Sequence, residues 1–145
     1  MQNATSKEYL TDAMWLVETI KNEDVILRAE SALLYLQLFN GYLGESEIKV
    51  YSKTKGLIDN VEYEVVSSFV DIAHFEDSGI LCSTLSQAVN DMLVDFDNSD
   101  HEVLAQALSN YYHSNRESFE GLSINPGNMD NFEYMRDWAL EYYLD

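Results

Sequence analysis

The chain has 145 residues, a formal net charge of −18 at pH 7, 46% hydrophobic residues and 12% aromatic residues. This composition can fill the core of one domain spanning residues 1–145, so intrinsic disorder is not expected despite the charge. The acidic balance argues against direct binding to nucleic acid or to anionic membranes, because both are polyanions.

The single cysteine, Cys82, excludes an internal disulfide bond. The N-terminus lacks the positive region and apolar core of a secretory signal, and no apolar run approaches the roughly 20 residues that span a bilayer. We therefore expect a protein of the bacterial cytoplasm.

Helical patterns occupy the first third of the chain. Thr5 and Glu8 have the spacing of a capping box, which predicts a first helix from Thr5 or Ser6. A second helix is expected from Glu23 to about Asn40, and the two would pair as an antiparallel hairpin.

The next segment, residues 45–56, fits either a short edge strand near 47–52 or a helix that begins at Ser46. It contains a basic cluster, Lys49, Lys53 and Lys55. These lysines fit a solvated connector, or alternatively a contact with phosphate or an acidic partner.

Helices are also expected in the remainder. A helix over 57–74 would place Ile58, Val61 and Val65 on one buried stripe. After a turn ending at Gly79, further helices are expected over 84–96, from Ser99 to about His113, and from about Asp130 onward, with a loop over 114–130. The predicted fold class is all-α: a bundle of five to six amphipathic helices, with at most one short edge strand.

The charge is distributed unevenly. The 60 residues between Lys55 and Arg116 contain no lysine or arginine. Carboxylates on solvated helix faces about one turn apart repel one another by roughly 0.2–0.5 kcal/mol per pair, which suggests that they serve solubility or a partner. This acidic stretch contains eleven carboxylates, namely Asp59, Glu62, Glu64, Asp71, Glu76, Asp77, Asp91, Asp95, Asp97, Asp100 and Glu102.

No pattern of catalytic or metal-binding residues accompanies this charge. Cys82 and the histidines are scattered, and the aspartates between Asp91 and Asp100 lack the central glycine and terminal glutamate of a calcium loop. No serine lies in a nucleophile elbow, and no glycine-rich loop could cradle a phosphate. We therefore expect no enzyme activity, metal or cofactor.

The sign and density of the carboxylates indicate mimicry of DNA, which presents one negative charge per roughly 1.7 Å of its axis. A rigid acidic protein could occupy the groove of a basic nucleic-acid-binding host protein and exclude the nucleic acid. The target would be a restriction enzyme or a CRISPR effector, and the eleven carboxylates would replace phosphates.

The segment Phe75-Glu76-Asp77-Ser78-Gly79, within about Ile58 to Phe96, resembles the Ocr antirestriction proteins of T7-like phages. The resemblance implies an all-helical, dimeric DNA mimic that blocks type I restriction enzymes. This chain differs from the family pattern in its greater length, its nearly charge-balanced first third and its aromatic end, Trp138 to Tyr143.

An alternative from another class is an immunity protein that neutralises a basic bacterial toxin, often a nuclease. Such a protein would act through a compact patch with aromatic hot spots. The tyrosine pairs Tyr111-Tyr112 and Tyr142-Tyr143 fit either ordinary packing or such an interface.

Overall fold

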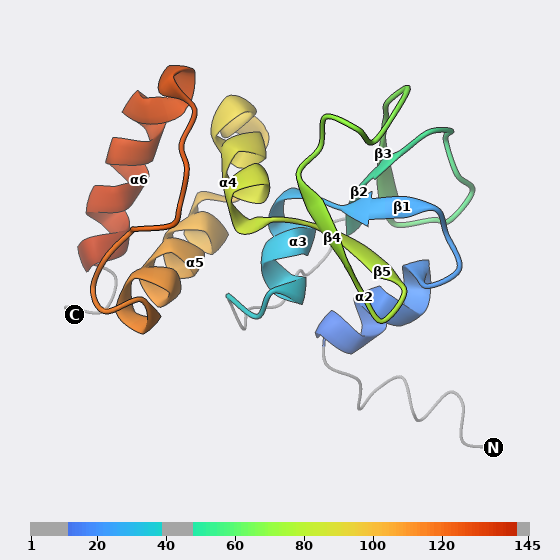
Figure 1. Cartoon of the computed structure of the whole chain (residues 1–145), viewed down its shortest axis with the longest axis horizontal. Helices are drawn as coiled ribbons and strands as arrows, with labels where there is room; N and C mark the ends of the chain where they lie inside the picture. Colours follow the sequence, from blue (N-terminus) through green and yellow to red (C-terminus); the bar gives the residue numbers. More distant parts are fainter. Residues whose placement is uncertain (1–11, 39–47, 142–145) are drawn as a thin grey trace.

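A five-stranded mixed sheet lies beside a group of three helices in the computed structural model, which describes residues 12–38 and 48–141 (Figure 1). Two further helices, α2 and α3, accompany the sheet. The elements in chain order are α2 (Asp12–Ile20), β1 (Val25–Leu27), α3 (Ala29–Tyr35), β2 (Ile48–Ser52), β3 (Val61–Val65), β4 (His74–Asp77), β5 (Ile80–Ser83), α4 (Leu85–Val94), the 3-10 turn η1 (Phe96–Asn98), α5 (His101–Ser114), the 3-10 turn η2 (Pro126–Asn128) and α6 (Met129–Glu141).

The strands are arranged in the order β3-β2-β1-β5-β4. β1 pairs antiparallel with β2 and parallel with β5, whereas β2 pairs parallel with β3. β4 and β5 form an antiparallel hairpin, in which Ser78 and Gly79 have the positive φ angles, 53° and 84°, that a two-residue type I′ turn requires. The two edge strands of this sheet are therefore β3 and β4.

One face of the sheet forms the main core. Leu27, Val50 and Cys82 are neighbours across β1, β2 and β5, and all three are fully buried. α3 packs on this face, where the Cys82 thiol lies 3.9 Å from the Ala32 carbonyl oxygen. α2 adds Leu16 and other apolar side chains to the same core.

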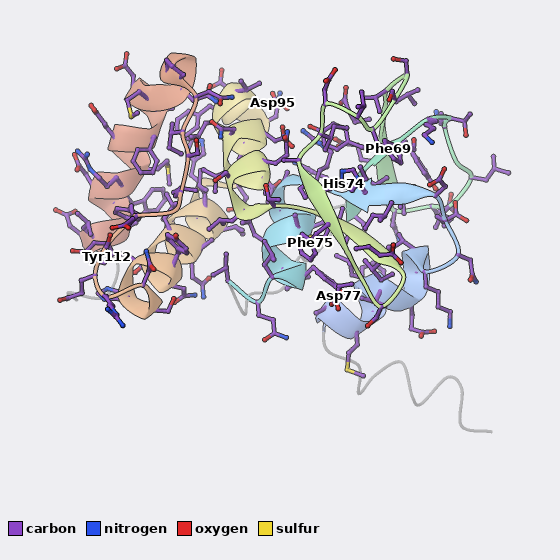
Figure 2. The ribbon with its side chains drawn as sticks, viewed as in Figure 1. Phe69, His74, Phe75, Asp77, Asp95 and Tyr112 are labelled. Carbon is purple, nitrogen blue, oxygen red and sulfur yellow. The ribbon has the colours of Figure 1, made fainter. Side chains whose placement is uncertain are left out.

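The opposite face is more polar. Tyr51 and Glu64 are neighbours on β2 and β3 there. The segment between β3 and β4 contributes Phe69, whose ring lies 4.8 Å from the Lys53 ammonium and 6.3 Å from the His74 ring (Figure 2). Charged and aromatic side chains from β2, β3 and the segment between β3 and β4 therefore gather on this face.

The helices α4, α5 and α6 extend the core away from the sheet (Figure 1). α4 begins at Thr84, whose hydroxyl accepts a hydrogen bond from the Gln87 backbone N–H, and α5 begins at Asp100, whose carboxylate accepts one from the Val103 N–H. Met92 of α4 and Met135 of α6 are fully buried in the shared core. These three helices confirm the helices predicted over 84–96, 99–113 and from 130 onward.

The predicted all-α fold class is wrong, because the sheet makes this an α/β fold. The helix expected over 57–74 is instead a turn, the strand β3 and an irregular segment. Over the described residues 23–38, the helix expected from Glu23 to about Asn40 is replaced by β1 and the short α3, so the predicted pairing of the first two helices as a hairpin is wrong as well.

The strand expected near 47–52 is confirmed as β2, but it lies inside the sheet between β3 and β1 and not at its edge. The capping box at Thr5 and Glu8 and the tyrosine pair Tyr142-Tyr143 lie outside the described residues.

Candidate functional site

The structure places the eleven carboxylates in three groups and one isolated position. The β3 group precedes or lies on one edge strand, the β4 group lies on or before the other edge strand, and the junction group surrounds the turn between α4 and α5. In this order, the groups are Asp59, Glu62 and Glu64; Asp71, Glu76 and Asp77; and Asp95, Asp97, Asp100 and Glu102.

All ten of these side chains are exposed. The structure does not gather them into one line, because β3 and β4 are opposite edges of the sheet. Figure 2 shows the same separation between Asp77, at the tip of the β4 and β5 hairpin, and Asp95, at the end of α4. A single partner surface would therefore meet the groups separately.

Asp91 is the isolated position, because its side chain is only 12% exposed. Its Oδ2 atom lies 3.9 Å from Arg28 Nε, and its Oδ1 atom accepts a hydrogen bond of 3.0 Å from Gln87. The Arg28 guanidinium also lies 4.8 Å from the centre of the Tyr51 ring. Asp91 thus joins α4 to the polar face of the sheet and is not available as a phosphate substitute.

Burial controls the ionisation of this cluster. Loss of solvent raises the pKa of Asp91, even though Tyr51, Arg28 and Gln87 favour its carboxylate form. Burial opposes the charge of Arg28, but the contacts with Tyr51 and Asp91 outweigh it and raise the pKa of the guanidinium. The surroundings of the pair therefore favour the charged form of Arg28 but disfavour the charged form of Asp91.

None of the ten exposed carboxylates forms an ion pair with a cation in the parts of the chain at 12–38 and 48–141. Five of the cations there contact other acids. The pairs are Lys21 with Glu18, Arg28 with Asp91, Lys49 with Glu30, Lys53 with Asp24, and Arg136 with Asp137. The negative charge of the acidic stretch is consequently left uncompensated at the surface.

The basic cluster near β2 is largely used within the fold. Lys49 Nζ lies 3.0 Å from Glu30 Oε1, and Lys53 Nζ lies 3.8 Å from Asp24 Oδ2. Glu30 also accepts a hydrogen bond of 2.8 Å from the Asp100 backbone N–H, which ties α3 to the start of α5. These contacts favour a structural role for Lys49, whereas Lys53 is half exposed and forms only a surface pair.

The acids of the junction group differ in their effect on helix stability. Asp100 caps α5 and Glu102 lies in its first turn, where negative charge stabilises a helix. Asp95 instead follows the last residue of α4, whose last turn contains no basic residue. An anion at a helix C-terminus is unfavourable by about 0.3–1 kcal/mol, so helix stability does not explain Asp95.

Aromatic side chains adjoin the junction group. The Phe96 ring stacks on His101 with centroids 4.0 Å apart and meets Tyr134 edge-on at 6.1 Å. Tyr134 is 60% exposed, and Trp138, one turn further along α6, is 37% exposed. Sequence reasoning missed Tyr134 and Trp138 as surface residues; the alternation Asp95-Phe96-Asp97 immediately after a helix was a usable signal.

A polar groove of about 350 Å³ lies where α4 meets the segment 123–125. Asn90 is one of its lining residues: its amide donates to the carbonyl oxygens of Ser86 and Ser123, and its Oδ1 accepts from the Asn125 N–H. Because the protein itself satisfies these groups, the groove is explained by the docking of the segment onto α4.

Within the described residues, no three His, Cys, Asp or Glu side chains gather as a metal site would require. No helix in that part of the chain has the length and apolar character to cross a bilayer. No protein-family model matches the chain, and neither a curated protein nor a solved structure matches it. A functional proposal must therefore start from the acidic surface itself.

Proposed function

We propose that the chain is an acidic inhibitor that binds the nucleic-acid groove of a basic host defence protein, a restriction enzyme or a CRISPR effector, and excludes DNA from it. One observation carries the proposal: ten carboxylates within 59–102 are exposed and lack a cation partner in the described residues. Such a surface repels nucleic acid and attracts the proteins that bind it.

The mode of mimicry differs from a regular helical array. The carboxylates of the β3, β4 and junction groups lie on edge strands, turns and helix ends. They would therefore reproduce the negative charge of DNA but not the regular spacing of its phosphates. The binding energy would arise where one group meets the groove, while the other groups would accelerate association through the long-range field.

A second candidate is an immunity protein that caps a basic toxin. The aromatic side chains beside the junction group favour it, because Phe96 and Tyr134 next to exposed acids fit a compact patch with aromatic hot spots. Both candidates share an acidic surface and a basic partner. They differ in the identity of the partner, a defence protein or a toxin, and, where the toxin does not itself bind DNA, in whether duplex DNA competes for it.

Affinity capture from a bacterial lysate at low salt tests the proposal. The immobilised protein is compared with a matched variant, E62Q/E64Q/D95N/D97N, with and without excess duplex DNA, and the retained proteins are identified by mass spectrometry. We expect DNA-binding defence proteins to be retained by the wild type, displaced by DNA and lost on the variant.

Capture of one toxin that DNA does not displace would replace the mimic with the immunity function. Equal retention on wild type and variant, or no retention at all, would contradict both.

A further inference from the structure

We propose that one surface, the junction patch, is the docking site for an arginine-rich segment of the partner protein; this inference rests on the proposed function. The patch combines aromatic rings from η1 and α6 with carboxylates on either side of Phe96 and at the start of α6. Its residues are Asp95, Phe96, Asp97, Asp130, Tyr134 and Trp138.

The patch is continuous across two elements. Phe96 meets the Tyr134 ring edge-on, and Asn131 donates a hydrogen bond of 3.1 Å to the Leu93 carbonyl oxygen, which fixes the start of α6 against the end of α4. Asp130, Tyr134 and Trp138 are spaced four residues apart and therefore share one face of α6. Phe96 packs against the core and contacts the Tyr134 ring before any partner arrives, which lowers the entropy lost on binding.

Four of the other exposed carboxylates have an explanation at the edges of the sheet. Glu62 and Glu64 lie on β3, and Glu76 and Asp77 lie on β4, the two edge strands. Charged side chains on edge strands prevent pairing with other chains. Asp77 also accepts a hydrogen bond of 2.6 Å from the Tyr35 hydroxyl.

Asp95 and Asp97 have no comparable explanation. Asp95 accepts a hydrogen bond of 2.8 Å from Asn98, but its charge lies at the unfavourable end of α4. Asp97 is exposed on η1. A cation supplied by a partner would offset the repulsion between Asp95 and the α4 carbonyl groups.

Charge and shape together specify an arginine-rich occupant. A guanidinium can stack on an exposed aromatic ring while donating hydrogen bonds to a neighbouring carboxylate, which an ammonium does less well. Arginine and tyrosine are also the residues that dominate the binding energy of protein interfaces. The patch offers both ring and carboxylate within one exposed surface.

Fluorescence anisotropy with labelled nona-arginine, at an ionic strength of about 100 mM where the Debye length is about 10 Å, tests the assignment. We expect D95N/D97N to weaken binding at least about fivefold, and Tyr134→Ala about threefold, whereas Tyr134→Phe should bind like the wild type. The matched control, E62Q/E64Q, removes the same charge from β3 and should change affinity less than about twofold. Unchanged thermal unfolding would show that each variant is folded.

Two outcomes would overturn the docking site. Equal weakening by D95N/D97N and E62Q/E64Q would mean that the charge acts diffusely, and the proposed inhibitor function would stand without this patch. Failure of the wild type to bind nona-arginine would also reject the patch, and lysate capture would show separately whether a basic partner exists.

Discussion

Replacing Arg28 by methionine should destabilise the fold far more than replacing Asp91 by asparagine. At the 3.9 Å that separates Arg28 Nε from Asp91 Oδ2, two unit charges attract by about 4 kcal/mol at an effective dielectric constant of about 20. Arg28→Met removes this attraction and leaves a carboxylate that is only 12% exposed. We expect it to lower the free energy of unfolding by about 3–4 kcal/mol at neutral pH.

Asp91→Asn loses the same attraction, but it also removes the desolvation penalty of the carboxylate. That penalty is the larger of the two, because burial raises the pKa of Asp91 despite the nearby cation. The asparagine keeps the position that accepts the Gln87 hydrogen bond, and Arg28 keeps its contact with the Tyr51 ring. We expect a change of less than about 1 kcal/mol.

The pH dependence has a defined sign. Because the folded-state pKa of Asp91 is raised, its contribution to stability is complete below the unfolded value, about 3.9, and is lost as pH rises through the folded value. Removing Arg28 raises that pKa further, so the Arg28→Met deficit should be large at pH 7 and shrink toward pH 4.

Urea unfolding followed by circular dichroism at both pH values measures these differences. The double variant R28M/D91N should recover most of the stability that Arg28→Met loses. A larger loss for Asp91→Asn than for Arg28→Met, or an Arg28→Met deficit independent of pH, would refute the reasoning.

Two other predictions concern buried polar groups. Burial raises the pKa of Cys82 to about 12. Its thiol should therefore not react with a disulfide reagent at pH 8 in the native protein, but should react rapidly in urea. A fast reaction of the native protein would contradict the placement of Cys82 under α3. Asn90→Ala should lower the free energy of unfolding by about 2–4 kcal/mol, because the Ser123 carbonyl oxygen, the Asn125 N–H and the buried Asn128 amide each lose a hydrogen bond to the Asn90 side chain. Thermal and urea unfolding measure this loss, and a near-neutral result would show that segment 123–125 does not depend on Asn90.

The later helices could be predicted because their signals are local. Thr84 and the region of Ser99 and Asp100 lie immediately before apolar residues at helical spacing, and both helices begin there. The cap of α5 is Asp100 and not the expected Ser99, whose hydroxyl instead donates to the carbonyl oxygens of Met92 and Asp95. Neighbouring polar residues can exchange capping roles without moving the helix.

The strand β3 was missed because the spacing of its apolar residues fits both a helix and a strand. Val61 and Val65 fit a helical stripe, but Val61, Tyr63 and Val65 also alternate with Glu62 and Glu64, as in a strand with one polar face. β-Branched and aromatic residues favour the second interpretation. The deciding interaction, parallel pairing with β2, joins segments that no local pattern connects.

The exposure of the acids could be predicted more fully than their arrangement. Ten of the eleven carboxylates are exposed, as expected of a solvated acidic surface. Asp91 is the exception because its partner, Arg28, follows β1, a strand that was predicted to be part of a helix. Phe96 adjoins Asp95 in the sequence, but its contact with Tyr134 could not be predicted, since Tyr134 reaches Phe96 only through the packing of α6 on α5.

The separation of the acids into groups assigns them different physical roles under the proposed function. A charge that stays more than about 10 Å from the partner acts mainly through the screened field, which affects the association rate. A charge in the contact also opposes dissociation, since leaving would expose a partner cation and an aromatic ring together. The β3 and β4 groups lie on opposite sheet edges, so one partner face cannot contact both and the junction patch equally. Carboxylates that keep the edge strands from pairing would therefore also steer the partner toward the patch that holds it.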